Sequence, residues 1–188
     1  FPKKGGSWSN RVKLLISDEP YWATAAIDRN YHGKRMITEM RFLGENPWRE
    51  KLRKSIEMNY FRHPFYDETM NLISPLLLNN EANIAEYNIE TTTTIARQLE
   101  LDTEKLKRSS ELLHKGSSNE LLCSLTGAVG GLTYMCGDGA DGYQDGSVFD
   151  KHGVNLCFQN FKHPVHTQHN RDEFMAGLSI IDALMNLG

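Results

Sequence analysis

Short apolar runs separated by polar turns dominate the start of the chain and predict strands. Residues 12–16 and 21–27 are apolar or β-prone, and the polar segment 17–20 between them contains a proline. We expect the two runs to pair as neighbouring strands. Residues 36–42 alternate apolar and polar side chains with a period of two, which predicts a third strand.

Helical spacing replaces this pattern in the middle of the chain. A helix is predicted to begin at Asn46, whose side chain can cap the first turn while Pro47 takes the first helical position. The dipeptide 63–64, His-Pro, ends this helix. Its apolar face consists of Trp48, Leu52, Ile56 and Tyr60. Two further helices are predicted over residues 72–77 and 84–99.

The last third of the chain returns to strands. Ser117 and Glu120 form a capping-box pattern for a helix that ends at the glycine pair 130–131. Residues 132–136 and 154–158 follow as predicted strands, which gives the local order helix, strand, loop, strand. The whole pattern indicates the α/β class, with a single-domain layered sheet and helices packed on it.

Composition limits the classes of function. The 188 residues, 39% hydrophobic and 24% charged, are typical of one soluble domain. No apolar run approaches the ~20 residues that a membrane span requires, and no signal segment is evident, so we expect a cytoplasmic protein. The net charge of −3 and the scattered basic residues argue against nucleic acid as a partner. The chain has three cysteines, an odd number without the paired spacing of a disulfide framework. We therefore expect them to be reduced residues of the core.

A glycine-rich loop follows the predicted strand 132–136. Gly137 and Gly139 lie at the carboxyl end of that strand, where α/β sheets commonly bind ligands and where glycines expose backbone donors. The aspartates at 138, 141 and 145 would repel a phosphate, and no helix signal follows at once. A ligand-binding loop and a plain surface turn therefore both remain open.

Imidazoles and one carboxylate gather near the end of the chain, in residues 160–186, which we call the polar tail. His163 can take a proton from a substrate amine or hydroxyl, with Asp182 holding its tautomer, or it can simply bond a backbone carbonyl. Asp182 lies on a strongly apolar helix and needs a partner, for which we predict Arg11. His163, His166 and His169 recur every three residues, but Pro164 argues against the helix that would align them, and we predict no metal site.

Several short motifs resemble one protein family. The tail contains His-Pro at 163–164 and Gln168, followed by Leu-Ser-Ile-Ile-Asp at 178–182 and Asn-Leu-Gly at 186–188. Near the start, residues 8–11 read Trp-Ser-Asn-Arg. These elements, with the glycine loop and Tyr143, resemble the WbqC-like family, and the likeness covers nearly the whole chain. His166 stands where the family has a tyrosine.

The resemblance implies a biological setting, and the residues permit a chemistry within it. WbqC-like genes tend to lie in bacterial surface-polysaccharide clusters, so we expect a protein of O-antigen-type glycan biosynthesis. It would be a transferase that attaches an acyl or aminoacyl group to a nucleotide-linked amino sugar, with a nucleotide sugar or glycan intermediate and an acyl donor as partners. The alternative is a non-catalytic binding or assembly protein of the same pathway. No cofactor is indicated.

The resemblance implies a domain organisation, and the chemistry of individual side chains suggests their roles within it. Residues 1–188 are expected to form a single WbqC-like domain that lacks the family's usual first strands, since the chain starts at Phe1 without them. His163 and Asp182 are the predicted catalytic pair. The predicted substrate-binding residues are Lys4, Trp8, Asn10, Arg11, Gly137, Gly139, Tyr143 and Gln168.

Overall fold

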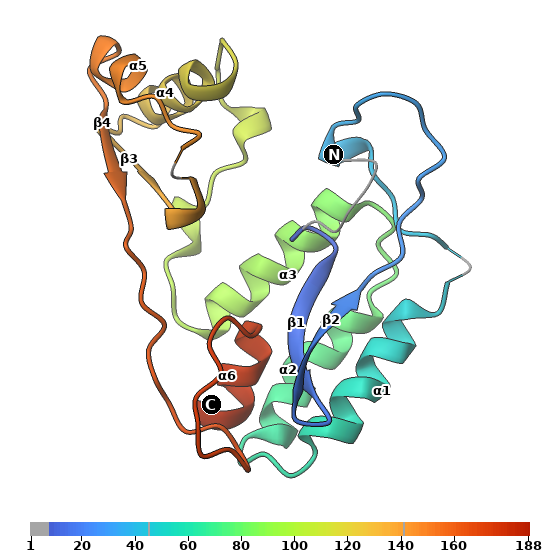
Figure 1. Cartoon of the computed structure of the whole chain (residues 1–188). Coiled ribbons are helices and arrows are strands. Elements are labelled where there is room, and N and C mark those ends of the chain that lie inside the picture. The colour runs from blue at the N-terminus through green and yellow to red at the C-terminus, as the bar shows by residue number, and fades with distance from the viewer. Residues whose placement is uncertain (1–7, 45, 141) are drawn as a thin grey trace. The chain divides into compact units, whose positions relative to one another are not determined.

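Helices and two separate pairs of strands make up the part of the chain that the computed structural model describes, residues 8–44, 46–140 and 142–188 (Figure 1). This arrangement confirms the α/β class. The helices within those ranges are α1 (Trp48–Tyr60), α2 (Tyr66–Leu78), α3 (Ile84–Gln98), α4 (Ser118–Ala128), α5 (Gly146–Lys151) and α6 (Ile180–Leu187). The strands are β1 (Arg11–Ile16), β2 (Glu19–Thr24), β3 (Thr133–Cys136) and β4 (Asn155–Phe158).

Strands β1 and β2 form an antiparallel hairpin, as the sequence predicts. Their register pairs Leu14 with Tyr21 and Ile16 with Glu19. The turn contains only Ser17 and Asp18, both with positive φ, 51° and 62°. Two left-handed residues match the twist of the flanking strands, which makes such short turns favourable in hairpins.

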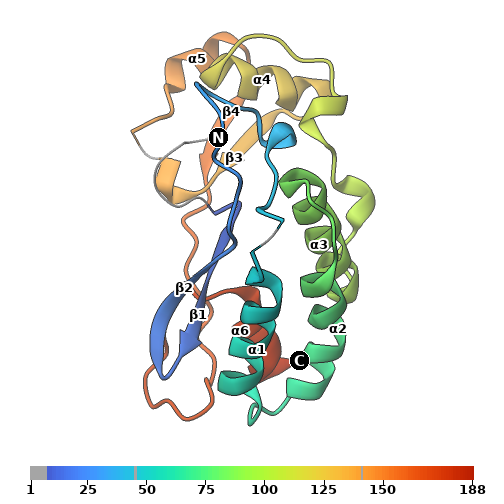
Figure 2. The ribbon, with the colours of Figure 1, turned by 90° about the vertical axis from the view of Figure 1, so that its right-hand side faces the viewer.

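The hairpin packs against helices on one of its faces. Figure 2 shows β1 and β2 on one side of α1 and α6, with α2 on the other side of these helices. The buried side chains of this cluster are Leu14, Leu15, Ile56, Tyr60, Met70, Ile73, Leu77, Ile181 and Met185. Helix α2 continues through Pro75 to Leu78. The sequence places this helix only at 72–77, so its first turns were missed.

A second buried cluster replaces the predicted third strand. Residues 36–42 contain a short 3₁₀ helix, Ile37–Glu39, and isolated bridges at Arg41 and Phe42. The prediction of a strand is wrong because the Glu39 carboxylate accepts a hydrogen bond from the Met36 backbone N–H at 2.9 Å and closes a turn. Phe42 still points inward and packs on Trp48 and Tyr87 at ring-centroid distances of 4.7 and 5.2 Å.

Helix boundaries follow local caps where side chains supply them. Helix α1 begins at Trp48, and its N-cap is Pro47 rather than the predicted Asn46. Helix α3 begins as predicted at Ile84, because the Asn83 side chain accepts hydrogen bonds from the N–H groups of Ala85 and Glu86.

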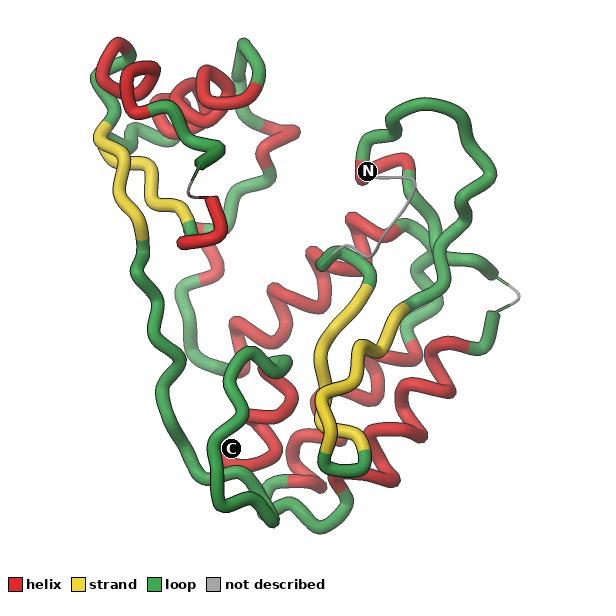
Figure 3. Tube along the Cα trace, viewed as in Figure 1, coloured by secondary structure: helices red, strands yellow, loops and turns green. Residues whose placement is uncertain are grey.

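Strands β3 and β4 pair in parallel and are connected through helix α5. Their register joins Thr133 to Asn155 and Cys136 to Phe158, and Figure 3 shows the four strands as two distinct pairs. The sequence predicts the strands but misses α5, which begins where the Asp145 carboxylate accepts a hydrogen bond from the Ser147 N–H at 3.0 Å. Ser117 makes no side-chain cap to α4, so the predicted capping box is wrong.

The chain divides into two compact units. The first holds the described residues up to Leu101 together with Pro164–Gly188, and the second is Asp102–His163. The second unit has its own cluster of three buried side chains, Cys123, Phe149 and Val154. The single domain predicted for residues 1–188 stays a prediction.

Because the buried side chains of the two units form separate clusters, a core substitution should act on one unit at a time. We expect Phe149→Ala to cost about 3–5 kcal/mol in the second unit and to raise amide hydrogen exchange there, with the first unit unchanged. Ile56→Ala is the reciprocal control. Equal loss of protection in both units would show that they unfold as one domain.

Candidate functional site

The Asp182 carboxylate is the most deeply buried charged group of the polar tail. Asp182 is 1% exposed and lies in the first turn of α6, whose N-cap is Ser179. A carboxylate is favoured at a helix N-terminus because of the backbone N–H groups and dipole there. Burial in an apolar helix is nevertheless costly unless hydrogen-bond donors reach the oxygens.

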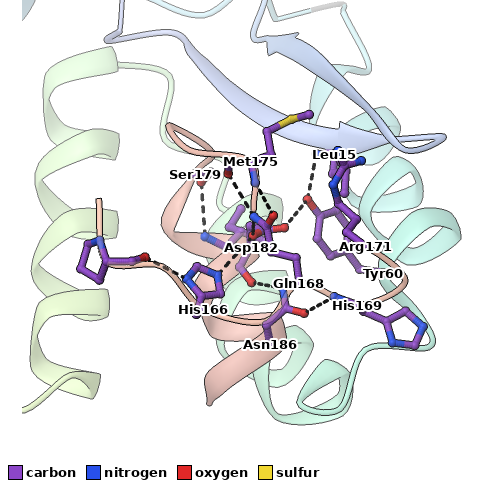
Figure 4. Close-up of polar contacts among 12 residues, drawn as sticks. Leu15, Tyr60, His166, Gln168, His169, Arg171, Met175, Ser179, Asp182 and Asn186 are labelled. Carbon is purple, nitrogen blue, oxygen red and sulfur yellow. Dashed lines mark hydrogen bonds and ion pairs between the residues drawn. The ribbon is translucent and has the colours of Figure 1, made fainter. Parts of the chain in front are cut away.

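Gln168 supplies the main donor. Its Nε2 donates to Asp182 Oδ2 at 2.8 Å and to the Met175 carbonyl at 3.1 Å, while its Oε1 accepts from the Met175 N–H at 2.7 Å. The amide is 3% exposed and engaged at both ends (Figure 4). Gln168 therefore ties the tail loop to α6 through the carboxylate.

Tyr60 reaches the same carboxylate from α1. Its hydroxyl lies 3.4 Å from Asp182 Oδ1 and accepts a hydrogen bond from the Leu15 N–H at 2.9 Å. Burial raises the pKa of the Tyr60 phenol well above its usual value, with Asp182 adding to the rise and the bond from Leu15 opposing it. Tyr60 is thus a neutral donor that connects β1, α1 and α6.

His166 is the imidazole beside Asp182. Its Nε2 lies 3.7 Å from Asp182 Oδ2, which is too long for a hydrogen bond but close enough for attraction when the ring is protonated. Its Nδ1 lies 3.4 Å from the Pro164 carbonyl. Both nitrogens of this ring face acceptor oxygens.

Asn186 extends the cluster along α6 toward a second imidazole. Its Nδ2 donates to the Asp182 carbonyl at 2.7 Å, and its Oδ1 accepts from the His169 N–H at 2.8 Å. The His169 ring then packs against His63 with centroids 4.8 Å apart and ring planes tilted by 47°. His63 lies between His169 and Tyr60, whose ring is 4.7 Å away.

His63 and His169 line a small polar pocket of about 190 Å³. His63 is 8% exposed, and among the described residues neither of its ring nitrogens has a hydrogen-bond partner of good geometry, although the Tyr60 backbone lies close enough to affect its pKa. His169 Nε2 is likewise buried and unpaired. Burial lowers the pKa of His63, and the neighbouring His169 lowers it further.

Near the start of the chain, the structure gives the predicted residues other partners. The guanidinium of Arg11 lies 4.2 Å from the centre of the Trp22 ring, whereas the Asp182 carboxylate has Gln168 and Tyr60 as its donors. The predicted Arg11–Asp182 pair is therefore wrong. The part of β1 near the carboxylate is Leu15, whose N–H bonds the Tyr60 hydroxyl. Arg11 precedes Leu15 by four residues, about 13 Å along the strand.

Two further predicted residues flank Arg11. Asn10 is buried, and its Nδ2 donates to the Ala25 carbonyl at 3.0 Å. This hydrogen bond joins the residue before β1 to the residue after β2. Trp8 is 75% exposed and meets Trp22 edge-on at 5.0 Å. Lys4 lies outside the described residues.

The glycine loop belongs to the second unit. The Asp138 carboxylate accepts hydrogen bonds from the backbone N–H groups of Asn160 at 2.7 Å and Phe161 at 2.9 Å, which joins the loops after β3 and β4. Gly137 and Gly139 have neither positive φ nor any atom within 4 Å of an added Cβ. Packing within the chain does not require glycine there. Tyr143 is 81% exposed.

The three tail histidines have different surroundings. His163 is exposed, ends the second unit and meets the Phe161 ring at 5.0 Å. His166 faces Asp182 and His169 faces His63. Among the residues that can be described, no group of three His, Cys, Asp or Glu side chains is placed to hold a metal ion.

The cysteines are free in the structure. Cys123 and Cys136 are buried, whereas Cys157 is exposed, so the prediction of three core cysteines is wrong for Cys157. The side chain of Cys157 points away from the buried face because β4 alternates exposed and half-buried positions.

Sequence reasoning missed Tyr60 and His63 as site residues. Tyr60 was assigned only to the apolar face of a helix, and His63 only to its end. Their three-residue spacing at the end of the predicted helix is the available signal, although α1 itself ends at Tyr60 and His63 lies in the turn that follows. The partner across the pocket, His169, cannot be assigned from spacing because it is 106 positions away in the printed sequence.

Comparison with known proteins identifies the family to which the chain belongs. The model of the WbqC-like protein family matches residues 3–188, and the chain belongs to this family. The chain is 22% identical over 182 residues to an uncharacterized protein of Mycobacterium tuberculosis, Rv1507c, a match that covers 96% of this chain and 78% of that protein. No solved structure matches significantly. None of the described helices is long and apolar enough to cross a membrane.

Asp182 should be essential for stability. Asp182→Ala leaves buried donors of Gln168 and Tyr60 unpaired, so we expect the free energy of unfolding to fall by about 3 kcal/mol. Chemical denaturation measures this loss. Asp172→Ala, an exposed aspartate of the same tail, should change stability by less than about 0.5 kcal/mol. Equally small losses of stability in both variants would contradict the role of Asp182 in connecting the tail loop, α1 and α6.

His63 should make stability depend on pH. Because its pKa is lowered in the folded state, folding favours the neutral ring, and its contribution is present above the unfolded pKa of about 6.5 and lost as pH falls toward the folded value. We expect the free energy of unfolding to decrease from pH 7 to pH 5, and to decrease less in His63→Phe. Identical pH profiles for both proteins would exclude this role.

Proposed function

We propose that this chain acts in the biosynthesis of a cell-surface glycan and transfers an acyl or aminoacyl group to a nucleotide-linked amino sugar. The observation that supports the proposal is the WbqC-like family match over residues 3–188. That match includes the polar tail with its imidazoles and the buried carboxylate. The tendency of WbqC-like genes to lie in bacterial surface-polysaccharide clusters suggests the pathway, and we expect the reaction to take place in the cytoplasm.

The proposed chemistry needs a proton acceptor. The sugar amine attacks the acyl carbon, a C–N bond forms, the bond from that carbon to the donor's leaving group breaks, and the amine proton passes to an imidazole. His163 was predicted for this step and stays the proposed acceptor. Asp182 is a positioning residue in this proposal, since its carboxylate holds Gln168 and lies beside His166.

Substrate-binding roles remain proposals for the residues that flank these groups. Arg11 offers a guanidinium that is half-buried over Trp22, which suits a nucleotide phosphate. The exposed ring of Trp8 suits stacking on a sugar. Gly137 and Gly139 are exposed after β3, with no atom within 4 Å of an added Cβ, which leaves room for an anion to approach the backbone.

One observation favours a second candidate, a non-catalytic binding or assembly protein of the same pathway. Asp182 is 1% exposed and its oxygens are occupied by Gln168 and Tyr60. A family motif that braces the fold in this way needs no role in catalysis. The two candidates differ in whether bound substrate turns over.

A thermal-shift titration with UDP-linked and dTDP-linked amino sugars tests both candidates. A ligand that binds only the folded state raises the unfolding midpoint, by about 2.7 kcal/mol of stabilisation at 100 times its Kd. We expect the unfolding midpoint to rise saturably with ligand concentration, and Arg11→Ala to weaken the affinity for the ligand at least tenfold. Arg97→Ala, an exposed arginine of α3, is the control.

Mass spectrometry after incubation with acyl-coenzyme A or aminoacyl donors then separates the two. Acylated sugar that disappears in His163→Asn supports the transferase. Saturable binding without product for any donor supports the assembly protein. The absence of any shift in a cooperatively folded protein would contradict both.

A further inference from the structure

Two cations of strand β1 share one aromatic ring of the hairpin. The guanidinium carbon of Arg11 lies 4.2 Å from the centre of the Trp22 ring, and Lys13 Nζ lies 5.2 Å from the same centre. Arg11 and Lys13 are two positions apart, so both project from the same face of β1. Lys13 also pairs directly with Trp22 in the register of the hairpin. The proposed function uses Arg11 and gives Lys13 no role.

Neither cation has an acidic partner among the described residues, whose ion pairs involve other groups. The acidic residues of the hairpin, Asp18 and Glu19, lie at its turn, whereas Arg11 and Lys13 lie in the first half of β1. Two positive charges beside one ring repel each other. An anion that contacts both would relieve this repulsion, so the pair points to a ligand of negative charge.

The charged ends of both side chains can be reached from solvent. Arg11 and Lys13 are half-buried, and of their side-chain nitrogens only Arg11 Nε is both buried and without a hydrogen bond. The tail passes beside Lys13, because the Ser179 N–H donates to the Lys13 carbonyl at 2.8 Å. Gly177 lies in this part of the tail, and a Cβ added there would be 3.8 Å from Lys13 Nζ. Glycine at this position therefore places no side chain against the ammonium.

The two cations suit an anion that carries two charged groups. Alternate residues of a strand are about 7 Å apart at Cα, which two long side chains can span to linked phosphoryl groups. Arg binds a phosphate in two-point geometry and Lys binds one as a point charge. The exposed Trp8 ring meets Trp22 edge-on at 5.0 Å and extends the aromatic surface beside the cations. It suits a ring that is joined to the phosphates.

We propose that Arg11 and Lys13 together bind the diphosphate of a nucleoside diphosphate-linked sugar, with Arg11 at one phosphate and Lys13 at the other. The inference deepens the proposed function and rests on it for the sugar that the diphosphate carries. It also sets a preference among nucleotide sugars. A sugar that is linked through a single phosphate, as in CMP-linked sugars, leaves Lys13 without a partner. Lys13 is therefore a specificity-determining residue.

Calorimetric titration of the full chain with inorganic pyrophosphate and with phosphate tests the site without any base, sugar or turnover. We expect pyrophosphate to bind about tenfold more tightly, since one more hydrogen bond between charged groups contributes about that factor. Lys13→Gln should abolish this preference and Lys13→Arg should keep it. Lys51→Gln, at an exposed lysine of α1, is the matched control and should bind both anions as the wild type does.

Equal affinity of the wild type for the two anions, or no binding of pyrophosphate, would overturn the proposal. These measurements need no variant, so they decide the matter even where Lys13→Gln does not fold. A preference for pyrophosphate that persists in folded Lys13→Gln would also overturn it, because Lys13 would then serve only to pack on Trp22. The unfolding midpoint of each variant without ligand shows whether it is folded.

Turnover separates this inference from the proposed function. Acyl transfer to a CMP-linked amino sugar at the same rate in wild type and Lys13→Gln would leave the proposed function standing while this inference fails. The expected preference for pyrophosphate, without acylated sugar from any nucleotide sugar and donor, would support the diphosphate site while the transferase proposal fails.

Discussion

The buried carboxylate of Asp182 is the constraint on which the rest of the first unit depends. An ionised oxygen that is removed from water must receive hydrogen bonds from the protein, and here they come from Gln168 and from Tyr60. These residues belong to segments far apart in the sequence. The carboxylate therefore holds the tail and α6 against α1, and through the Leu15 N–H against β1.

Parts of this arrangement follow from local sequence signals and parts do not. The hairpin, α3 and the strand pair after α4 are predicted because turn residues, an Asn cap and apolar periodicity act over a few positions. The need of Asp182 for a partner is also predictable from its apolar helix. The identity of that partner cannot be predicted, because the tertiary fold of the tail loop brings Gln168, and not Arg11, to the carboxylate. The same limit explains residues 36–42, where one side-chain bond from Glu39 overrides a strand pattern.

The glycine loop shows how a structure changes the meaning of a charge. In the sequence, Asp138 argues against phosphate because a carboxylate next to the glycines would repel it. In the fold, this carboxylate is bound by the N–H groups of Asn160 and Phe161. Part of its charge is thus compensated locally, and its position joins the two strand ends. Gly137 and Gly139 are exposed beside that junction, with no atom within 4 Å of an added Cβ. The loop therefore stays a candidate for ligand binding.

Asp182 and His63 are both buried polar groups, yet they indicate different roles. Asp182 has partners within the chain, so its energetic cost is offset by the fold that it organises. His63 packs between the tilted rings of Tyr60 and His169, and among the described residues its nitrogens have no hydrogen-bond partner of good geometry. Asp182 therefore organises the first unit through its hydrogen-bond partners, whereas His63, whose pKa burial lowers, makes the stability of that unit depend on pH.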